Sequence, residues 1–207
     1  PEACEPAFAA LIRRGDLTPA DRRARLRLAH EAGNLRTAQA QGAGLPGHER
    51  VPDRDFNEVS RDPLRALDRG SFAWATGGGR ELALFALERA ARSDAGAARP
   101  AWVKVRDRMP EADRRYGNAR LAFHAARQLN PAANDWFREA GNVPLSADAH
   151  AWRVRAALRA QAWDDVAAAI AAMPESQRQE AAWRYWRARA LAAQGRQDEA
   201  NALLTVL

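Results

Sequence analysis

Two neighbouring segments near the end of the chain carry the same pattern of residues, and this repeat restricts the fold more than any other feature. The segments begin at Trp152 and Trp183, and each reads as an apolar helix, a turn and a second helix. Five residue pairs match at an offset of 33: Leu158 with Leu191, Gln161 with Gln194, Asp165 with Asp198, Ala167 with Ala200, and Ile170 with Leu203. This offset is the length of a two-helix repeat. One helix pair cannot bury its apolar stripe alone, so such pairs stack on their neighbours.

The repeat therefore predicts an all-α fold, an α-α superhelix or solenoid of stacked helix pairs that is tetratricopeptide-like and curved or ring-forming. Prolines and glycines predict where the helices begin and end. Thr18-Pro19 and Asp62-Pro63 each place a capping residue before a proline at the first helical position. We expect helices at 2–14, 19–32, 34–42, 62–76, 80–93, 98–108, 111–128, 131–139, 146–160, 163–172, 175–194 and 197–207.

Two stretches interrupt this helical pattern. Residues 42–57 contain Pro46 and Pro52, and we expect a surface connection or a bent junction there. Gly77–Gly79 is expected to be a second loose point, between two helices. Because helical patterns continue across both stretches, we predict a single domain over 1–207, with its clearest repeats at 146–172 and 175–207.

Composition places the chain among folded proteins, because 47% of its residues are hydrophobic and 28% are charged. The formal net charge of +6 suits an anionic partner, but arginines on the solvated faces of many helices would produce the same charge. Cys4 is the only cysteine, which excludes an internal disulfide and a cysteine-based metal site. No apolar stretch is long enough to span a membrane. The chain begins at Pro1 instead of methionine, which we interpret as a mature or trimmed form.

Motifs for cofactor or metal chemistry are missing from the sequence. The four histidines, at positions 30, 48, 124 and 150, form no two-histidine metal pair. Gly77–Gly79 lacks the lysine and hydroxyl that follow the glycines of a phosphate-binding loop, and no strand precedes it. We therefore expect no metal and no cofactor.

The second half of the chain carries a distinctive series of motifs. Trp152, Leu158 and Trp163 are followed by a Met173-Pro174 turn, and then by Trp-Arg-Tyr-Trp-Arg-Ala-Arg-Ala-Leu at 183–191. In this order they resemble the N-terminal superhelical domain of soluble lytic murein transglycosylases. The start of the chain, with Cys4-Glu-Pro-Ala-Phe8 and later Gly33-Asn34, is similar to the entry into that domain, whereas residues 47–145 share only helical character with it.

This resemblance implies a curved or ring-shaped α-superhelix, followed in the family by a separate lysozyme-like domain that performs the chemistry. It also implies a periplasmic protein that acts on peptidoglycan glycan strands, where the family cleaves the bond between muramic acid and glucosamine and leaves an anhydro sugar. The family needs no metal or organic cofactor. A cell-wall protein partner is a further possibility.

The family's catalytic glutamate precedes a serine in an E-S-x-F-like motif, and its pocket raises its pKa so that it serves as acid and then base. The only Glu-Ser pair here is Glu175-Ser176, which directly follows Pro174 and is not followed by phenylalanine. An acid at a helix start favours the helix dipole, so we interpret Glu175 as structural. We expect the catalytic residues to lie beyond Leu207 and this chain to be inactive alone.

Aromatic and basic residues near the repeat are the candidate ligand contacts, because a flat indole suits a pyranose and arginines suit anionic muropeptides. The candidate glycan or partner contacts are Trp183, Arg184, Arg187, Trp152 and Arg153. The alternative is structural: the tryptophans pack into the core, with Trp186, Ala190 and Ala193 as an inward stripe, and the arginines pair with Asp164, Asp165, Asp198 and Glu199.

Three functions fit these observations. The first is a non-catalytic scaffold and binding domain of a lytic transglycosylase, and the second is a stand-alone tetratricopeptide-like adaptor that grips a peptide or protein. The positive charge raises a third, nucleic-acid binding, but no recognised nucleic-acid motif is present. We therefore expect neither a nucleic-acid partner nor a membrane span.

Overall fold

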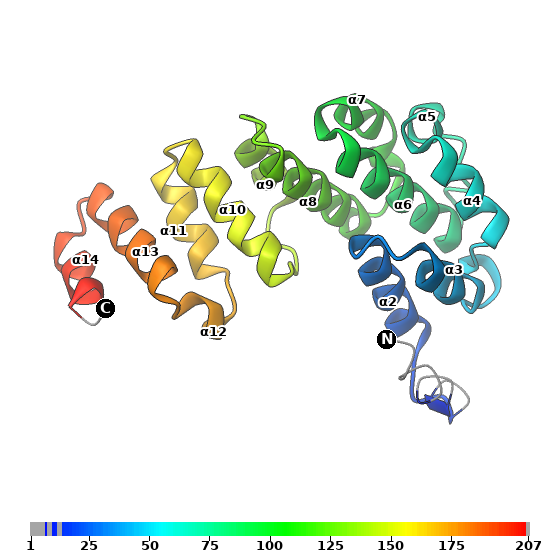
Figure 1. Cartoon of the computed structure of the whole chain (residues 1–207), viewed down its shortest axis with the longest axis horizontal. Helices are drawn as coiled ribbons and strands as arrows, with labels where there is room; N and C mark the ends of the chain where they lie inside the picture. Colours follow the sequence, from blue (N-terminus) through cyan, green and yellow to red (C-terminus); the bar gives the residue numbers. More distant parts are fainter. Residues whose placement is uncertain (1–6, 8–9, 12–13, 206–207) are drawn as a thin grey trace. The chain divides into compact units, whose positions relative to one another are not determined.

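The computed structural model describes residues 7, 10–11 and 14–205, and these residues form helices with no β-strand among them (Figure 1). The predicted all-α class is confirmed. The α-helices are α2 (Pro19–Glu31), α3 (Leu35–Ala43), α4 (Asp53–Arg61), α5 (Pro63–Arg69), α6 (Gly77–Ser93), α7 (Ala95–Val105), α8 (Glu111–Arg127), α9 (Ala133–Ala140), α10 (Ala147–Arg159), α11 (Trp163–Ala171), α12 (Glu175–Arg178), α13 (Ala181–Ala193) and α14 (Gln197–Leu204). Two 3₁₀ helices, η2 (Gly47–Glu49) and η3 (Arg106–Arg108), join them.

The chain divides into two compact units. The first unit comprises Pro1–Ser93 and Ala97–Pro110, and the second comprises Asp94–Gly96 and Glu111–Leu207. Within the first unit α2 packs on α3 and α6, and α5 packs on α6. Within the second unit α8 packs on α9, α10 on α11, α11 on α13, and α13 on α14. A single domain over 1–207 stays a prediction, because compactness does not test whether the two units unfold together.

One turn recurs at four places where the structure describes all of its residues, and it explains why the chain forms helix pairs. Its central residue has a positive φ, at Gly33 (70°), Leu129 (59°), Gln161 (52°) and Gly195 (77°). In each case the N–H of this residue donates to the carbonyl three residues back at 3.0 Å, and the next N–H donates to the carbonyl five residues back at 2.9–3.0 Å. This arrangement is the Schellman motif, which satisfies carbonyls at the end of a helix. The next helix then begins within a few residues.

These turns correct the predicted repeat length. The hydrogen bonds of Gln161 match those of Gly195, so the last two helix pairs are offset by 34 residues and not by the predicted 33. The predicted alignment matched Gln161 with Gln194, but Gln194 is the C-cap of α13 and has a φ of −85°. The register between the two repeats is set by the residue with the left-handed backbone conformation, and not by a match of side-chain type. Leu129 and Gln161 are 32 apart, so the repeat length varies along the chain.

The prediction for residues 42–57 was also wrong in part, because α4 begins at Asp53 within that stretch. Val51 and Phe56 are buried, so this stretch contributes to the core of the first unit. The predicted helix over 62–76 ends at Gly70, where a left-handed conformation closes α5. The predicted helix over 2–14 falls mostly outside the described residues.

Gly77–Gly79 is not the predicted loose point, because these glycines form the first turn of α6. A Cβ atom on Gly78 would lie 2.3 Å from the carbonyl oxygen of Arg50, and one on Gly79 would lie 2.2 Å from that of Ala73. The glycines are needed because two other segments of backbone pass this close to the helix. The predicted helix over 175–194 is likewise two helices, α12 and α13.

Candidate functional site

Of the two candidate tryptophans, Trp183 is engaged in packing within the second unit. Trp183, on α13, is only 7% exposed and lies in a core cluster with Val154, Ile170 and Met173. Its indole N–H donates to the Glu180 carboxylate at 3.1 Å. Trp186 is partly buried against the same cluster, and Ala190 is fully buried, but Ala193 is exposed. The positions of Trp183, Trp186 and Ala190 support the packing alternative, whereas Ala193 does not belong to an inward stripe.

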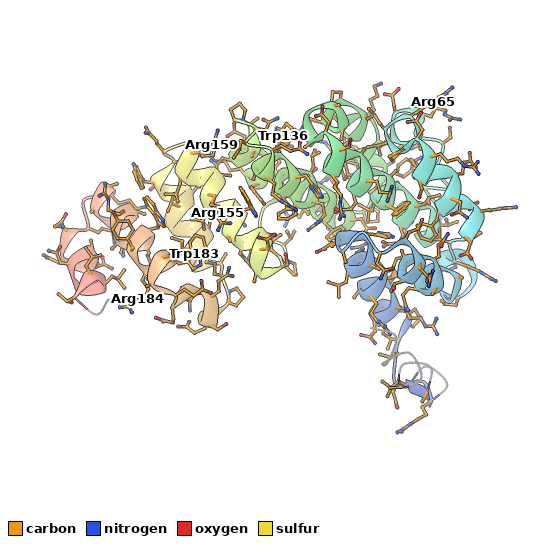
Figure 2. All side chains as sticks on the ribbon, in the orientation of Figure 1. Arg65, Trp136, Arg155, Arg159, Trp183 and Arg184 are labelled. Atoms are coloured by element: carbon orange, nitrogen blue, oxygen red, sulfur yellow. The ribbon has the colours of Figure 1, made fainter. Side chains whose placement is uncertain are left out.

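Arg155 lies against two of these tryptophans. Its guanidinium is 4.9 Å from the ring centre of the half-buried Trp152 and 5.7 Å from that of Trp183. Arg155 and Trp183 belong to α10 and α13 and are labelled in Figure 2. Such contacts between a cation and an aromatic face contribute about 0.5–2 kcal/mol. The i, i+3 spacing of Arg155 from Trp152 is a signal of this contact in the sequence.

The candidate arginines fall into two groups. Arg153 donates from Nη1 to the carbonyl of Gly141 at 3.3 Å, and burial lowers its pKa. Arg184, also labelled in Figure 2, donates from Nη2 to the carbonyl of Leu203 at 3.3 Å. Arg187 is exposed and makes no hydrogen bond or ion pair with the described residues. Among the candidates, Arg187 therefore has the guanidinium best placed to meet a ligand.

The predicted acidic partners of these arginines pair with other residues. Asp165 pairs with Arg138 at 2.6 Å, and Glu199 pairs with Arg196 at 2.6 Å. Asp164 accepts a hydrogen bond from Gln194 at 2.7 Å. None of these three acids forms its ion pair with a candidate arginine, but Arg153 helps Arg138 to lower the pKa of Asp165, and Arg187 helps Arg196 to lower that of Glu199. Arg196 and Glu199 have an i, i+3 spacing that predicts such a pair, whereas Arg138 and Asp165 lie 27 positions apart and have no local signal.

Arginines satisfy helix ends throughout both units. Among the described residues, these arginines donate to a carbonyl in or just after the last turn of a helix: Arg22 to Gly44, Arg92 to Glu31, Arg108 to Gly70, Arg153 to Gly141, Arg159 to Leu129, Arg178 to Ala171, and Arg184 to Leu203. The last carbonyls of a helix lack partners within it, and the negative end of its dipole favours a cation. Part of the positive charge is therefore structural.

Glu175 has the environment of a structural residue. It lies in the first turn of α12, its side chain is 62% exposed, and it pairs with Arg178. Gln179 also donates to it at 2.5 Å. An exposed, paired carboxylate lacks the apolar pocket that keeps a catalytic acid protonated near neutral pH. This geometry supports the structural interpretation of the Glu-Ser pair.

The buried carboxylates of the first unit also have partners. Glu81 is 2% exposed and accepts hydrogen bonds from Arg27 at 3.1 Å. Glu88 is 3% exposed and pairs with Arg92 at 3.1 Å. Among the residues that the structure describes, no three His, Cys, Asp or Glu side chains gather where they could hold a metal ion. None of the helices in the described ranges is both long enough and apolar enough to cross a bilayer.

Neither a model of a known protein family nor a curated protein sequence matches this chain. Solved structures do match it. An inactive mutant of the lytic transglycosylase Slt from Pseudomonas aeruginosa is 25% identical, with a TM-score of 0.65 over 100% of this chain and 34% of that one. The 70-kDa soluble lytic transglycosylase of Escherichia coli is 24% identical, with a TM-score of 0.58 over 99% of this chain and 34% of that one.

A 70-kDa soluble lytic transglycosylase in complex with bulgecin A is also 24% identical, with a TM-score of 0.55 over 99% of this chain and 34% of that one. The chain thus spans about a third of the length of the structures that it matches. The predicted fold of stacked helix pairs is confirmed by these neighbours. The chain has the fold of this part of the soluble lytic transglycosylases, and the likeness fits a member of the lytic transglycosylase family.

Proposed function

We propose that this chain is a non-catalytic scaffold and binding domain of a soluble lytic murein transglycosylase, acting in peptidoglycan cleavage and turnover in the periplasm. The observation that carries this proposal is the structural match to the Pseudomonas aeruginosa lytic transglycosylase over the whole of this chain. The exposed and paired state of Glu175 supports the non-catalytic part, because this glutamate belongs to the chain's only Glu-Ser pair.

The contact surface that we propose for glycan strands lies on α10 and α13. It consists of Trp152, Arg155 and Arg187. Trp183 is held in the core, and Arg153 and Arg184 are held by hydrogen bonds to helix-end carbonyls. Arg155 and Arg187 are exposed and carry positive charge, which suits the anionic peptides attached to muramic acid. A cell-wall protein partner is compatible with the same domain.

Sacculi test both parts of the proposal. The 207-residue chain should sediment with purified cell-wall sacculi and should not clear their turbidity. Arg187→Gln should weaken the sedimentation, whereas Arg36→Gln, at an exposed arginine of the first unit, serves as the matched control. Clearing by this chain would show that it is catalytic. A failure to sediment with sacculi would remove the binding role.

The four recurring turns keep a second function open, because they are the architecture of a helical-repeat adaptor for peptides or proteins. An adaptor would retain a protein partner in the absence of peptidoglycan. Sedimentation with sacculi that have been stripped of bound protein therefore separates the two functions. Binding to the stripped sacculi supports the transglycosylase domain, and binding only to untreated sacculi supports the adaptor.

A further inference from the structure

A pocket of about 250 Å³ lies in the first unit, where the end of α2, the start of α3 and one side of α6 meet. Its lining includes His30, Gly33, Asn34, Phe85, Arg89 and Arg92. Gly33, Asn34 and Arg92 are exposed, so the pocket opens to solvent on their side. His30, which also lines the pocket, is only 4% exposed.

Two buried nitrogen atoms of this lining have no hydrogen bond. They are Nε2 of His30 and Nε of Arg89. A buried donor or acceptor without a partner costs about 1–3 kcal/mol, and native proteins contain few of them. A larger pocket of about 400 Å³, bounded by α4, α5 and the start of α6, has no such atom in its described lining. Of these two pockets, only the smaller one is therefore lined by buried nitrogens that have no hydrogen-bond partner.

The charge around this pocket is unbalanced. Arg92 is neutralised, because it pairs with Glu88 at 3.1 Å and donates to the Glu31 carbonyl at 2.7 Å. Arg89 has no ion pair or hydrogen bond with the described residues, and its guanidinium lies 5.8 Å from the ring centre of Phe85. The positive end of the α3 dipole also faces this region, since the N-cap Asn34 belongs to the lining. An anionic ligand would compensate the positive charge of Arg89 and the positive end of the α3 dipole.

The unsatisfied nitrogens also restrict the chemistry of that ligand. The Nε–H of arginine can only donate, so the missing partner must be an acceptor. A carboxylate is planar, matches the guanidinium and accepts several hydrogen bonds with its two oxygens. Burial lowers the pKa of His30 to about 3, so its imidazole is neutral near pH 7 and has one N–H to donate.

We propose that this pocket binds the carboxylate of a small ligand, with Arg89 as its charged contact. The carboxylate belongs either to a small free acid or to the C-terminal end of a peptide. The pocket lies in the other unit from the surface on α10 and α13, and the proposal does not depend on peptidoglycan binding.

Calorimetric titration of the 207-residue chain at constant ionic strength tests this proposal. The probes are acetate, the dipeptide D-alanyl-D-alanine, the same dipeptide with an amidated C-terminus, and chloride. Arg89→Gln should weaken carboxylate binding at least about tenfold, as expected for one charge-assisted hydrogen bond. Arg69→Gln is the matched control, because Arg69 lines the larger pocket and also lacks an ion pair with the described residues. Its variant should bind as the parent does.

Each outcome decides the matter. Binding of acetate and of the free dipeptide, but not of the amide, supports a peptide end as the ligand. Binding of acetate alone supports a small free acid. The proposal is overturned if neither carboxylate binds saturably, since water alone then occupies the pocket. It is also overturned if chloride binds as well as acetate, or if Arg89→Gln leaves carboxylate binding unchanged.

Discussion

His30 should make the first unit sensitive to mild acid. Its ring is 4% exposed and packs against Phe85 and Phe56, with ring centres 4.9 and 5.8 Å apart. Burial is the main cause that lowers its pKa from 6.5 to about 3, and the nearby charge of Arg27 acts in the same direction, while Glu88 opposes them. The folded state therefore holds this imidazole neutral at pH values where the unfolded chain would protonate it.

The sign and size of the effect follow from these two pKa values. As the pH falls below 6.5, the unfolded state binds a proton that the folded state does not, so the free energy of unfolding decreases. The decrease reaches about 2 kcal/mol at pH 5, because 1.36 kcal/mol accompanies each pH unit in the intervening range. It levels off near pH 3 at about 5 kcal/mol, where folded His30 is also protonated. Above about pH 7.5 the stabilisation is complete.

Denaturant unfolding at pH 7.5 and pH 5.0 measures this loss, and amide hydrogen exchange in α2 and α6 assigns it to the first unit. His30→Leu keeps an apolar side chain of similar size between the two phenylalanines, so its stability should fall by about 2 kcal/mol less than the parent's over this range. Other groups that titrate in this range cancel in the comparison. His48→Gln, at an exposed histidine, is the control and should behave as the parent does. An equal loss in His30→Leu and the parent would refute the reasoning.

The recurring turn and the buried tryptophans supply the remaining predictions. Gly195→Ala should lower the free energy of unfolding by about 1 kcal/mol, because a Cβ there meets no atom within 4 Å and the only cost is the positive φ. Gln161→Gly should instead raise the free energy of unfolding by about 0.5 kcal/mol, since Gln161 already bears the strain of a positive φ. Denaturant unfolding measures both changes, and equal effects of the two would contradict this account. Trp183→Ala should cost about 3–5 kcal/mol and Trp186→Ala more than about 2 kcal/mol, because each leaves a cavity in the second unit. An unchanged melting midpoint for Trp186→Ala would identify it as a surface residue.

Local signals explain which parts of the fold were predictable. Thr18 accepts a hydrogen bond from the Asp21 N–H at 3.2 Å, and Asp21 accepts one from the Thr18 N–H at 2.8 Å, so α2 begins where its capping residue predicts. Asp62 caps α5 in the same way, through the N–H of Arg65. Each of these hydrogen bonds joins residues three positions apart, so the sequence alone predicts them. The family resemblance also rested on contiguous motifs.

Long-range contacts decided the features that sequence reasoning missed. Gly77–Gly79 reads as a loose point by itself, and only the approach of Arg50 and Ala73 shows why glycines are required in a helix. The contact of Arg155 with Trp183 joins two helices across 28 positions of the sequence, with no local signal.

The sequence by itself determined the helical class, most helix ends and the pairing of consecutive helices, because these depend on hydrogen bonds between residues a few positions apart. The tertiary structure alone decided the 34-residue register of the last repeat, through the left-handed residues Gln161 and Gly195. It alone also placed His30 and Arg89 in one pocket, 59 positions apart. Their unsatisfied nitrogens arise from packing between α2 and α6, and packing between distant segments leaves no pattern in the order of residues.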